Sequence, residues 1–157
     1  MRRLLALALS LFVLVSVASA AALPAKFDPS RDAAADVAYA VSLAKRGGKR
    51  VIVDVGGEWC SWCHIMDRFI ASNADVRSLI DANYIWVKVN FSKENRNEAL
   101  LAHWPKIEGY PHLFFLDANG ALLHSQDTSL LESGKGYDRQ RFLAMLRRFA
   151  PAKSTRI

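Results

Sequence analysis

The feature that most constrains the fold of this chain is a short apolar run that leads directly into a pair of cysteines. Residues 50–55 (RVIVDV) are mostly β-branched, which is typical of a short strand buried on both faces. Gly56 and Gly57 then turn the chain toward Cys60 and Cys63. Apolar residues recur at i,i+4 spacing after the first cysteine, so the pattern predicts a strand, a turn and a helix that opens there.

Cys60 and Cys63 are the only cysteines, and their spacing lets two thiols close a small disulfide and reopen it. The thiolate is the nucleophile in thiol–disulfide exchange, and the positive end of a helix dipole lowers the pKa of a thiol placed there. A disulfide that closes so short a loop constrains little of the unfolded chain. The pair is therefore predicted to do redox chemistry rather than to stabilise the fold.

The start of the chain predicts export. Basic residues (Arg2 and Arg3) precede an apolar run over residues 4–17 and a small-residue end at residues 18–20 (ASA). This order is typical of a signal peptide with its cleavage site. We expect residues 1–20 to be removed and the mature chain to enter an oxidising compartment, the periplasm or another extracytoplasmic space. The alternative is an uncleaved membrane anchor.

The remaining length predicts one domain with a core of its own. We expect an N-terminal extension over residues 21–30, a domain over 31–150 and a tail over 151–157. The formal net charge of the whole chain is +6. No clustered basic stripe with interleaved aromatic residues accompanies that charge, so no nucleic-acid partner is predicted.

Helices and strands are predicted to alternate along this domain. In order, the patterns predict a helix over 32–46 capped by Ser30, a strand over 50–55, a helix over 60–71, a short helix begun by Ser72 or Asn73, a strand over 84–91, a helix over 94–104, a hairpin of 112–117 and 121–125 around Asn119-Gly120, and a helix over 137–149. This order implies an α/β fold in which helices flank a central mixed sheet.

Two segments resemble the thioredoxin superfamily, in particular its small exported members. Residues 53–63 (VDVGGEWCSWC) look like the active-site segment of that family. Residues 107–112 (IEGYPH), followed by an apolar strand, look like its cis-proline loop. The chain departs from the family in the Ser-Trp pair between its cysteines and in His64 after them. The resemblance implies a thioredoxin-like fold.

The resemblance also implies roles for the central residues. Cys60 would be the exposed nucleophile that attacks a partner disulfide, and the more buried Cys63 would resolve the mixed disulfide. Asp54 lies in a run that favours burial on both faces, and burial of an unpaired carboxyl raises its pKa toward neutrality. It is therefore the predicted base. Glu58 and His64 are expected near the rim, where they would tune the thiols.

The proline loop is predicted to bind client proteins. The resemblance implies a cis bond before Pro111, and it implies that the backbone of Tyr110 pairs with an extended substrate segment by strand addition. Trp59 and Trp62 would offer an apolar landing surface. Protein thiols and disulfides are the expected partners, together with a membrane electron donor, and no bound cofactor is expected.

Two other functions compete with this interpretation. Residues 60–64 (CSWCH) form a haem-attachment motif, in which His64 would be one axial ligand and Met66 or Met145 the second. A copper carrier would instead combine both cysteines with His112 or His64, because thiolates and imidazole suit copper. The favoured prediction is a periplasmic thiol–disulfide oxidoreductase that acts on protein cysteines as a reductant.

Overall fold

A four-stranded mixed sheet forms the centre of the molecule, of which the computed structural model describes residues 22–152. The strand order is β2-β1-β3-β4. The strands are β1 (Arg50–Gly56), β2 (Tyr84–Asn90), β3 (His112–Leu116) and β4 (Leu122–Asp127). β1 pairs in parallel with β2 and antiparallel with β3, and β3 pairs antiparallel with β4. The predicted mixed sheet is confirmed.

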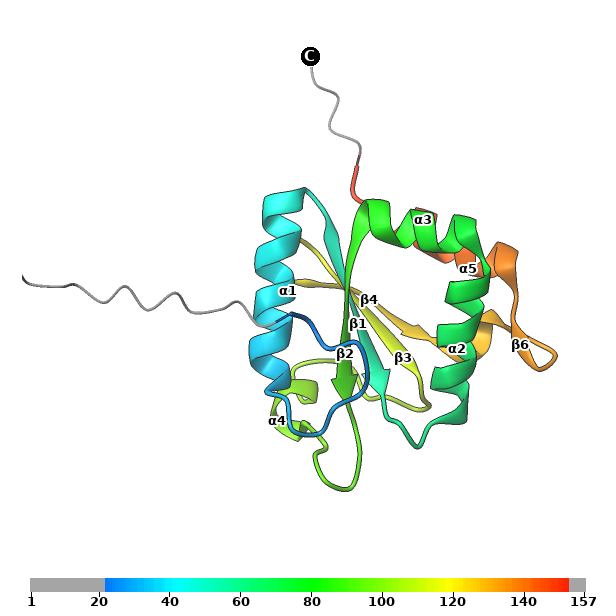
Figure 1. Ribbon diagram of the computed structural model, residues 1–157. Helices are drawn as coiled ribbons and strands as arrows, with labels where there is room; N and C mark the ends of the chain where they lie inside the picture. Colours follow the sequence, from blue (N-terminus) through cyan, green and yellow to red (C-terminus); the bar gives the residue numbers. More distant parts are fainter. Residues whose placement is uncertain (1–21, 153–157) are drawn as a thin grey trace, which may run out of the picture.

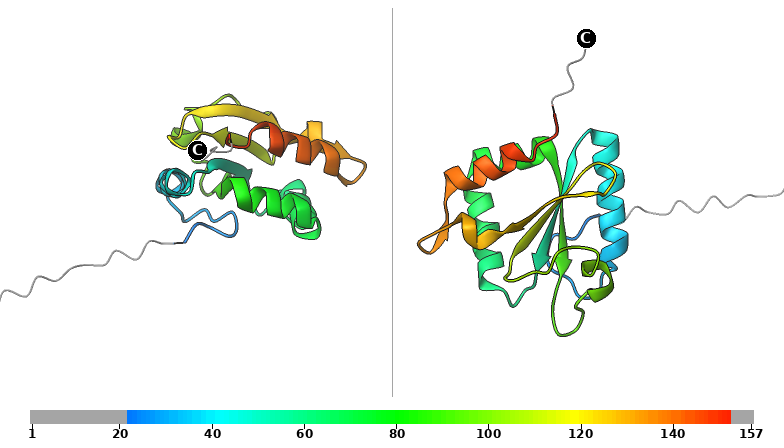
Figure 2. Two further views of the ribbon diagram at one scale, coloured as in Figure 1. Left: turned by 90° about the horizontal axis from the view of Figure 1, so that it is seen from above. Right: turned by 180° about the vertical axis from the view of Figure 1, so that it is seen from behind.

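Helices cover both faces of this sheet, which Figure 1 shows nearly edge-on and Figure 2 shows from above. One face carries α1 (Ala33–Gly47) and the short α4 (Glu98–Leu101). The other carries α2 (Ser61–Ser72), α3 (Ala74–Asn83) and α5 (Arg139–Arg148). Between β4 and α5 lie elements that the sequence did not predict: a 3₁₀ turn, η1 (Thr128–Leu131), and a ribbon of β5 (Glu132–Ser133) and β6 (Gly136–Tyr137).

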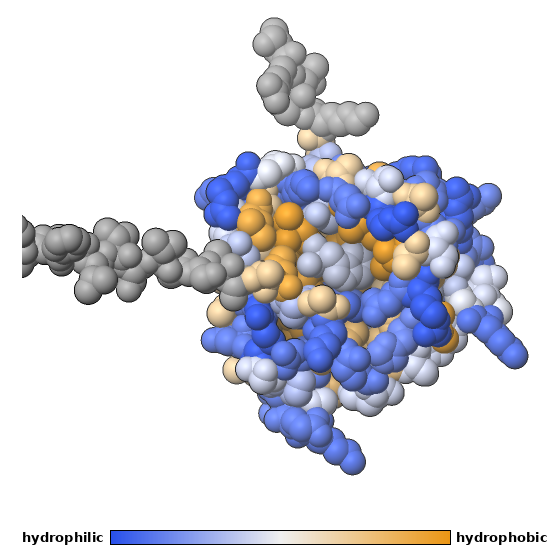
Figure 3. All heavy atoms as spheres, in the orientation of Figure 1, coloured by the Kyte–Doolittle hydropathy of each residue, from blue (hydrophilic) through white to orange (hydrophobic). Residues whose placement is uncertain are grey.

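Alternate residues of β1 contribute to two separate cores. Val51, Val53 and Val55 pack with α1, whereas Ile52 packs with α2, α3 and α5. Successive side chains of a strand point to opposite faces, so Asp54 lies on the same face as Ile52. The central strand therefore directs one carboxyl to the side of the sheet where α2 begins. On the face seen in Figure 3, most residues are hydrophilic, and hydrophobic ones gather between α1 and α3.

The helix expected over residues 94–104 is wrong, because only Glu98–Leu101 is helical there. Asn97 adopts a left-handed conformation (φ 49°), and its Nδ2 donates to the backbone oxygen of Asn90 at 2.7 Å. An asparagine side chain that binds nearby backbone competes with helix formation. The apolar residues that suggested a helix still pack against the core under α1: Leu100, Leu101 and Trp104.

The predicted hairpin between β3 and β4 is confirmed. Gly120 has a φ of 87°, a conformation that favours glycine. The carboxylate of Asp117 accepts from the backbone N of Asn119 at 2.8 Å and of Ala121 at 2.9 Å. The final helix is shorter than the expected 137–149, because Tyr137 pairs in β6.

Within residues 22–152, no helix is both long and apolar enough to cross a membrane. The predicted signal peptide, residues 1–20, lies outside the described residues.

The start of α1 gives a test of the cap assignment. Asp32, not the expected Ser30, caps the helix, since its side chain accepts from Ala35 N at 3.0 Å. Ser30 instead bonds Asp28 at the surface. We expect Asp32→Ala to lower the free energy of unfolding by about 1 kcal/mol, and Ser30→Ala to change it by less than about 0.5 kcal/mol. Urea denaturation measures both, and a larger loss for Ser30→Ala would contradict the assignment.

Candidate active site

A disulfide between Cys60 and Cys63 lies at the N-terminus of α2, with an S–S distance of 2.11 Å. Cys60 is the N-cap of the helix, and its Sγ accepts from the backbone N of Cys63 at 3.1 Å. The helix thus opens at the first cysteine, as the sequence predicts. A sulfur in this position faces the positive end of the helix dipole, which favours its thiolate form when the disulfide is reduced.

Both sulfurs are enclosed in this oxidised form. Cys60 is 3% exposed and Cys63 is 1% exposed. The expectation that Cys60 is exposed is therefore not met here, because Trp62 and Tyr110 pack against the cluster that contains both cysteines.

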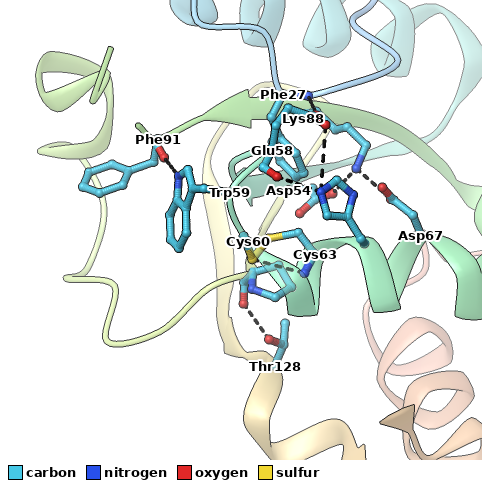
Figure 4. The surroundings of a disulfide bond; sticks show 12 residues. Phe27, Asp54, Glu58, Trp59, Cys60, Cys63, Asp67, Lys88, Phe91 and Thr128 are labelled. Carbon is cyan, nitrogen blue, oxygen red and sulfur yellow. Dashed lines mark hydrogen bonds and ion pairs between the residues drawn. A yellow bond between two sulfur atoms is a disulfide. The ribbon is translucent and has the colours of Figure 1, made fainter. Parts of the chain in front are cut away.

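Asp54 is buried on one side of the disulfide and is bonded there by two donors (Figure 4). Its Oδ2 accepts from Lys88 Nζ and from Trp86 Nε1, each at 3.1 Å. Burial raises the pKa of Asp54 in spite of these contacts. The predicted burial and raised pKa are confirmed, but the expectation of an unpaired carboxyl is wrong, because the parallel register of β1 and β2 sets Lys88 opposite Asp54.

Lys88 binds a second carboxylate as well. Its Nζ lies 2.7 Å from Oδ1 of Asp67, a partly exposed residue of α2. Burial opposes the charge of Lys88, but Asp54 and Asp67 together outweigh that effect and raise the pKa of Lys88. Among the buried side-chain atoms of the described residues, Asp54 Oδ1 is one that has no hydrogen-bond partner. Asp54 therefore keeps one free acceptor beside a shared cation.

Phe27 also belongs to this site, although no pattern in the sequence pointed to it. The residue lies in the expected N-terminal extension and packs in one cluster with Cys60 and Cys63. Its backbone N donates to Oε1 of Glu58 at 2.9 Å. Glu58 thus anchors the N-terminal segment. The backbone O of Glu58 lies 2.8 Å from His64 Nε2. This contact holds the His64 imidazole against the turn that precedes α2.

The proline loop lies against the same disulfide cluster. The Tyr110–Pro111 peptide bond is cis, and the oxygen of Pro111 accepts from Thr128 Oγ1 at 2.5 Å. The Tyr110 ring stacks on Phe91, with 4.9 Å between centroids, and meets the edge of Trp59 at 5.6 Å. The structure therefore joins two of the predicted client-binding residues, Tyr110 and Trp59, in one aromatic group.

The two tryptophans of the predicted landing surface differ in their surroundings. Trp59 is 58% exposed and borders a largely apolar groove of about 430 Å³, which Phe91 and Arg96 also line. Trp62 instead turns inward, where its ring meets the edge of Tyr137 at 5.6 Å between centroids. Trp59 is thus placed to contact a client, whereas Trp62 packs the interior beside the disulfide.

The histidines proposed as ligands of a metal or haem have other partners. His112 is buried, and its Nε2 lies 2.8 Å from Ser125 Oγ. Burial lowers the pKa of His112. Across residues 22–152, no group of three or more His, Cys, Asp or Glu side chains is placed to hold a metal ion. In this disulfide form, the described residues place no third donor of that kind beside Cys60 and Cys63.

Comparisons with known proteins agree with this geometry. A family model described as thioredoxin-like matches residues 32–118. A thiol:disulfide interchange protein DsbD from Colwellia psychrerythraea is 30% identical over 91 residues, which are 57% of this chain and 15% of that protein. A disulfide bond reductase DsbH from Chlamydia pneumoniae is 30% identical over 76 residues, 43% of this chain and 45% of the relative. The chain thus spans less than half the length of these two relatives.

Solved structures share the fold. A disulphide isomerase from Xylella fastidiosa superimposes with a TM-score of 0.67 at 22% identity, covering 81% of this chain and 96% of that one. The oxidised C-terminal domain of DsbD from Neisseria meningitidis gives a TM-score of 0.58 at 18% identity, covering 80% and 99%. The matched family model spans more than half of the chain, and its region holds the disulfide, Asp54 and the cis-proline. The chain belongs to the thioredoxin-like family.

Proposed function

We propose that this protein is a thiol–disulfide oxidoreductase that exchanges disulfides with protein cysteines through Cys60 and Cys63. The observation that carries the proposal is a disulfide at a helix N-terminus, packed against a cis-proline loop and beside a buried carboxyl. The similarity to a thiol:disulfide interchange protein and to a disulfide bond reductase supports the same chemistry. The apolar leader over residues 1–20 supports export to the periplasm.

In the reducing direction, the reaction proceeds in two exchanges. The Cys60 thiolate attacks a client disulfide, forms a mixed disulfide and expels one client thiolate. Cys63 then gives up its proton and attacks Cys60 Sγ, which closes the protein disulfide and releases the second client thiolate. The client gains two electrons that the dithiol loses. Asp54 is the base for the proton of Cys63, because its raised pKa brings its proton affinity closer to that of a thiol.

The same charges favour the role of a reductant. The helix dipole stabilises the Cys60 thiolate, whereas the charge of Asp54 opposes further negative charge on the sulfurs. No histidine lies between the cysteines, where Ser61 and Trp62 stand. The reduced form is then only moderately stabilised, so the dithiol donates electrons readily. An exported reductant needs an electron donor that reduces its disulfide again, and we propose that this donor lies in the membrane.

The reduction potential of the dithiol tests the direction of the reaction. We expect a value near that of thioredoxin, about −270 mV, in equilibrium with a glutathione or dithiothreitol buffer. A value near −120 mV, typical of a strong oxidase, would contradict the reductase assignment while leaving disulfide exchange intact.

Trapping of clients tests the division of roles between the cysteines. We expect Cys63→Ser to accumulate mixed disulfides with client proteins, because Cys60 still attacks and nothing resolves the product. Cys60→Ser should accumulate few. Non-reducing electrophoresis of the two variants measures this, and equal trapping by both would contradict the assigned roles.

Replacing the buried carboxyl of Asp54 is expected to change both the rate of Cys63-dependent release and the stability of the fold. Asp54→Asn should slow Cys63-dependent release by about a hundredfold and leave attack by Cys60 nearly unchanged. Because the folded-state pKa is raised, ionisation of Asp54 costs stability as the pH rises above the range of an ordinary aspartate. The variant should therefore be more stable than the parent at neutral pH, and the gain should vanish in acid. Lys88 keeps Asp67 as a partner in this variant.

Rapid mixing and urea denaturation at two pH values measure these effects. Asp81→Asn is the matched control, since Asp81 borders the groove beside Lys88 and is exposed. Equal behaviour of the Asp54 and Asp81 variants would rule out Asp54 as the base.

Client binding gives a further prediction for Trp59. Trp59→Ala should raise the KM for a disulfide-containing protein about tenfold, with little change in kcat, because it removes an exposed aromatic contact beside the disulfide. Leu122→Ala removes an exposed apolar side chain at the far end of β4 and should leave KM unchanged. Steady-state reduction of insulin compares the two, and a KM unaltered by Trp59→Ala would remove Trp59 from the client surface.

A further inference from the structure

The segment that precedes the family match reaches the redox site. Residues 22–31 come before α1, and in Figure 1 this segment (blue) crosses the edge of the sheet at β2. It carries Phe27 to the sheet face that holds Asp54 and α2. Phe27 is 1% exposed. The segment is therefore fixed to the domain by a fully buried aromatic ring.

Separate contacts fix the position of this ring (Figure 4). The backbone N of Phe27 donates to Glu58 Oε1 at 2.9 Å. Lys88 Nζ lies 4.1 Å from the centre of the ring, within the range of a cation–π interaction. The ring also packs in a cluster with Cys60 and Cys63. Phe27 thus contacts Lys88 of the charged pair and also packs with both cysteines.

Gly56, the last residue of β1, leaves room for this arrangement. A Cβ at Gly56 would lie 2.5 Å from Cys63 Sγ and 3.0 Å from Phe27 Cζ. The first distance is shorter than any ordinary Cβ contact, and the second is tighter than most of them. The ring and the second sulfur therefore converge on the same face of one glycine, where no side chain fits between them.

We propose that Phe27 is a positioning residue of the redox site, which keeps water away from the Asp54–Lys88 pair and from Cys63. The inference rests on the proposed function, in which Asp54 is the base for Cys63. Phe27 itself transfers no proton and has no polar side-chain atom. It acts by limiting the access of water to Asp54.

The charges around Asp54 show why water exclusion matters here. Lys88 lowers the pKa of Asp54, but burial raises it by more. The Phe27 ring lies against Lys88, the partner of Asp54, so it covers one side of the pair with apolar atoms and adds no charge. The other charged or titratable groups facing the pair and its groove are Asp67 and Cys63 of α2, Arg77 and Asp81 of α3, Tyr137 of β6, and Glu58.

The test measures separately the two thiol–disulfide exchanges by which the Cys60/Cys63 dithiol is oxidised. Reduced protein is mixed with an aromatic disulfide whose released thiolate is coloured. Attack by Cys60 releases one thiolate, and attack by Cys63 on the mixed disulfide releases the second, whose rate is measured against pH. We expect Phe27→Ala to move the rise of this second rate to lower pH, because a hydrated Asp54 ionises more easily. We also expect its plateau to fall about tenfold, because the base is weaker.

Conservative and matched variants separate this effect from loosening of the segment. Phe27→Leu refills most of the volume with apolar atoms and should stay close to the parent profile. Leu23→Ala truncates another side chain of the segment, one that packs against the core under α1, and should leave the profile unchanged. A Phe27→Ala profile that superimposes on the parent, or an equal shift from Leu23→Ala, would overturn the inference.

Glu58 provides a second test that holds even if Phe27→Ala does not fold. Glu58→Ala removes the acceptor of the Phe27 N–H, whereas Glu58→Gln keeps an oxygen there. We expect the alanine variant to shift the profile more than the glutamine variant, and equal profiles would contradict the proposal. A parent protein that shows no second release would refute the proposed function itself. A parent with both releases and unresponsive variants would refute this inference alone.

Discussion

The parallel register of β1 with β2 is the constraint on which the redox site depends. It sets Asp54 opposite Lys88, on the face of the sheet where α2 begins. A carboxylate buried alone there would cost several kcal/mol. Lys88 offsets part of that cost, but the same ammonium also binds Asp67. Burial raises the pKa of Asp54 by more than Lys88 and Trp86 lower it, and the nearby charge of Asp67 adds to the rise, so Asp54 stays incompletely compensated.

A carboxylate whose charge is only partly compensated, as that of Asp54 is, suits the proposed task of taking up a proton and releasing it again. A carboxylate with ideal partners has a low pKa and is a weak base, whereas a carboxyl with no partner stays protonated and accepts nothing. The helix N-terminus acts in the opposite sense on the neighbouring sulfur, since it favours the Cys60 thiolate. In the proposed mechanism the two sulfurs are therefore tuned separately: the dipole prepares Cys60 for attack, and Asp54 governs when Cys63 follows.

Local patterns in the sequence predicted much of this site. The cysteine spacing, the buried run over residues 50–55 and the proline loop each carry their information within a few neighbouring residues. The contributions of Lys88 and Phe27 were missed, because each contact joins segments more than thirty residues apart: Lys88 is 34 residues from Asp54, and Phe27 is 31 from Glu58. No local pattern sets such a register. A signal was nevertheless present, since a lysine within an otherwise apolar strand needs a buried counter-charge.

Gly56 was a second feature of the sequence that could have indicated a close contact at this site. A glycine that ends a buried β-branched run marks a position where other atoms approach the backbone closely. Those atoms are Cys63 Sγ from within the family match and the Phe27 ring from before it. Thr128, which binds the proline loop, lies after it. The matched region thus supplies the disulfide and Asp54, and the flanking segments complete their surroundings. If Asp54 is the base that we propose, the segment before the match sets its hydration and hence the pH at which Cys63 attacks.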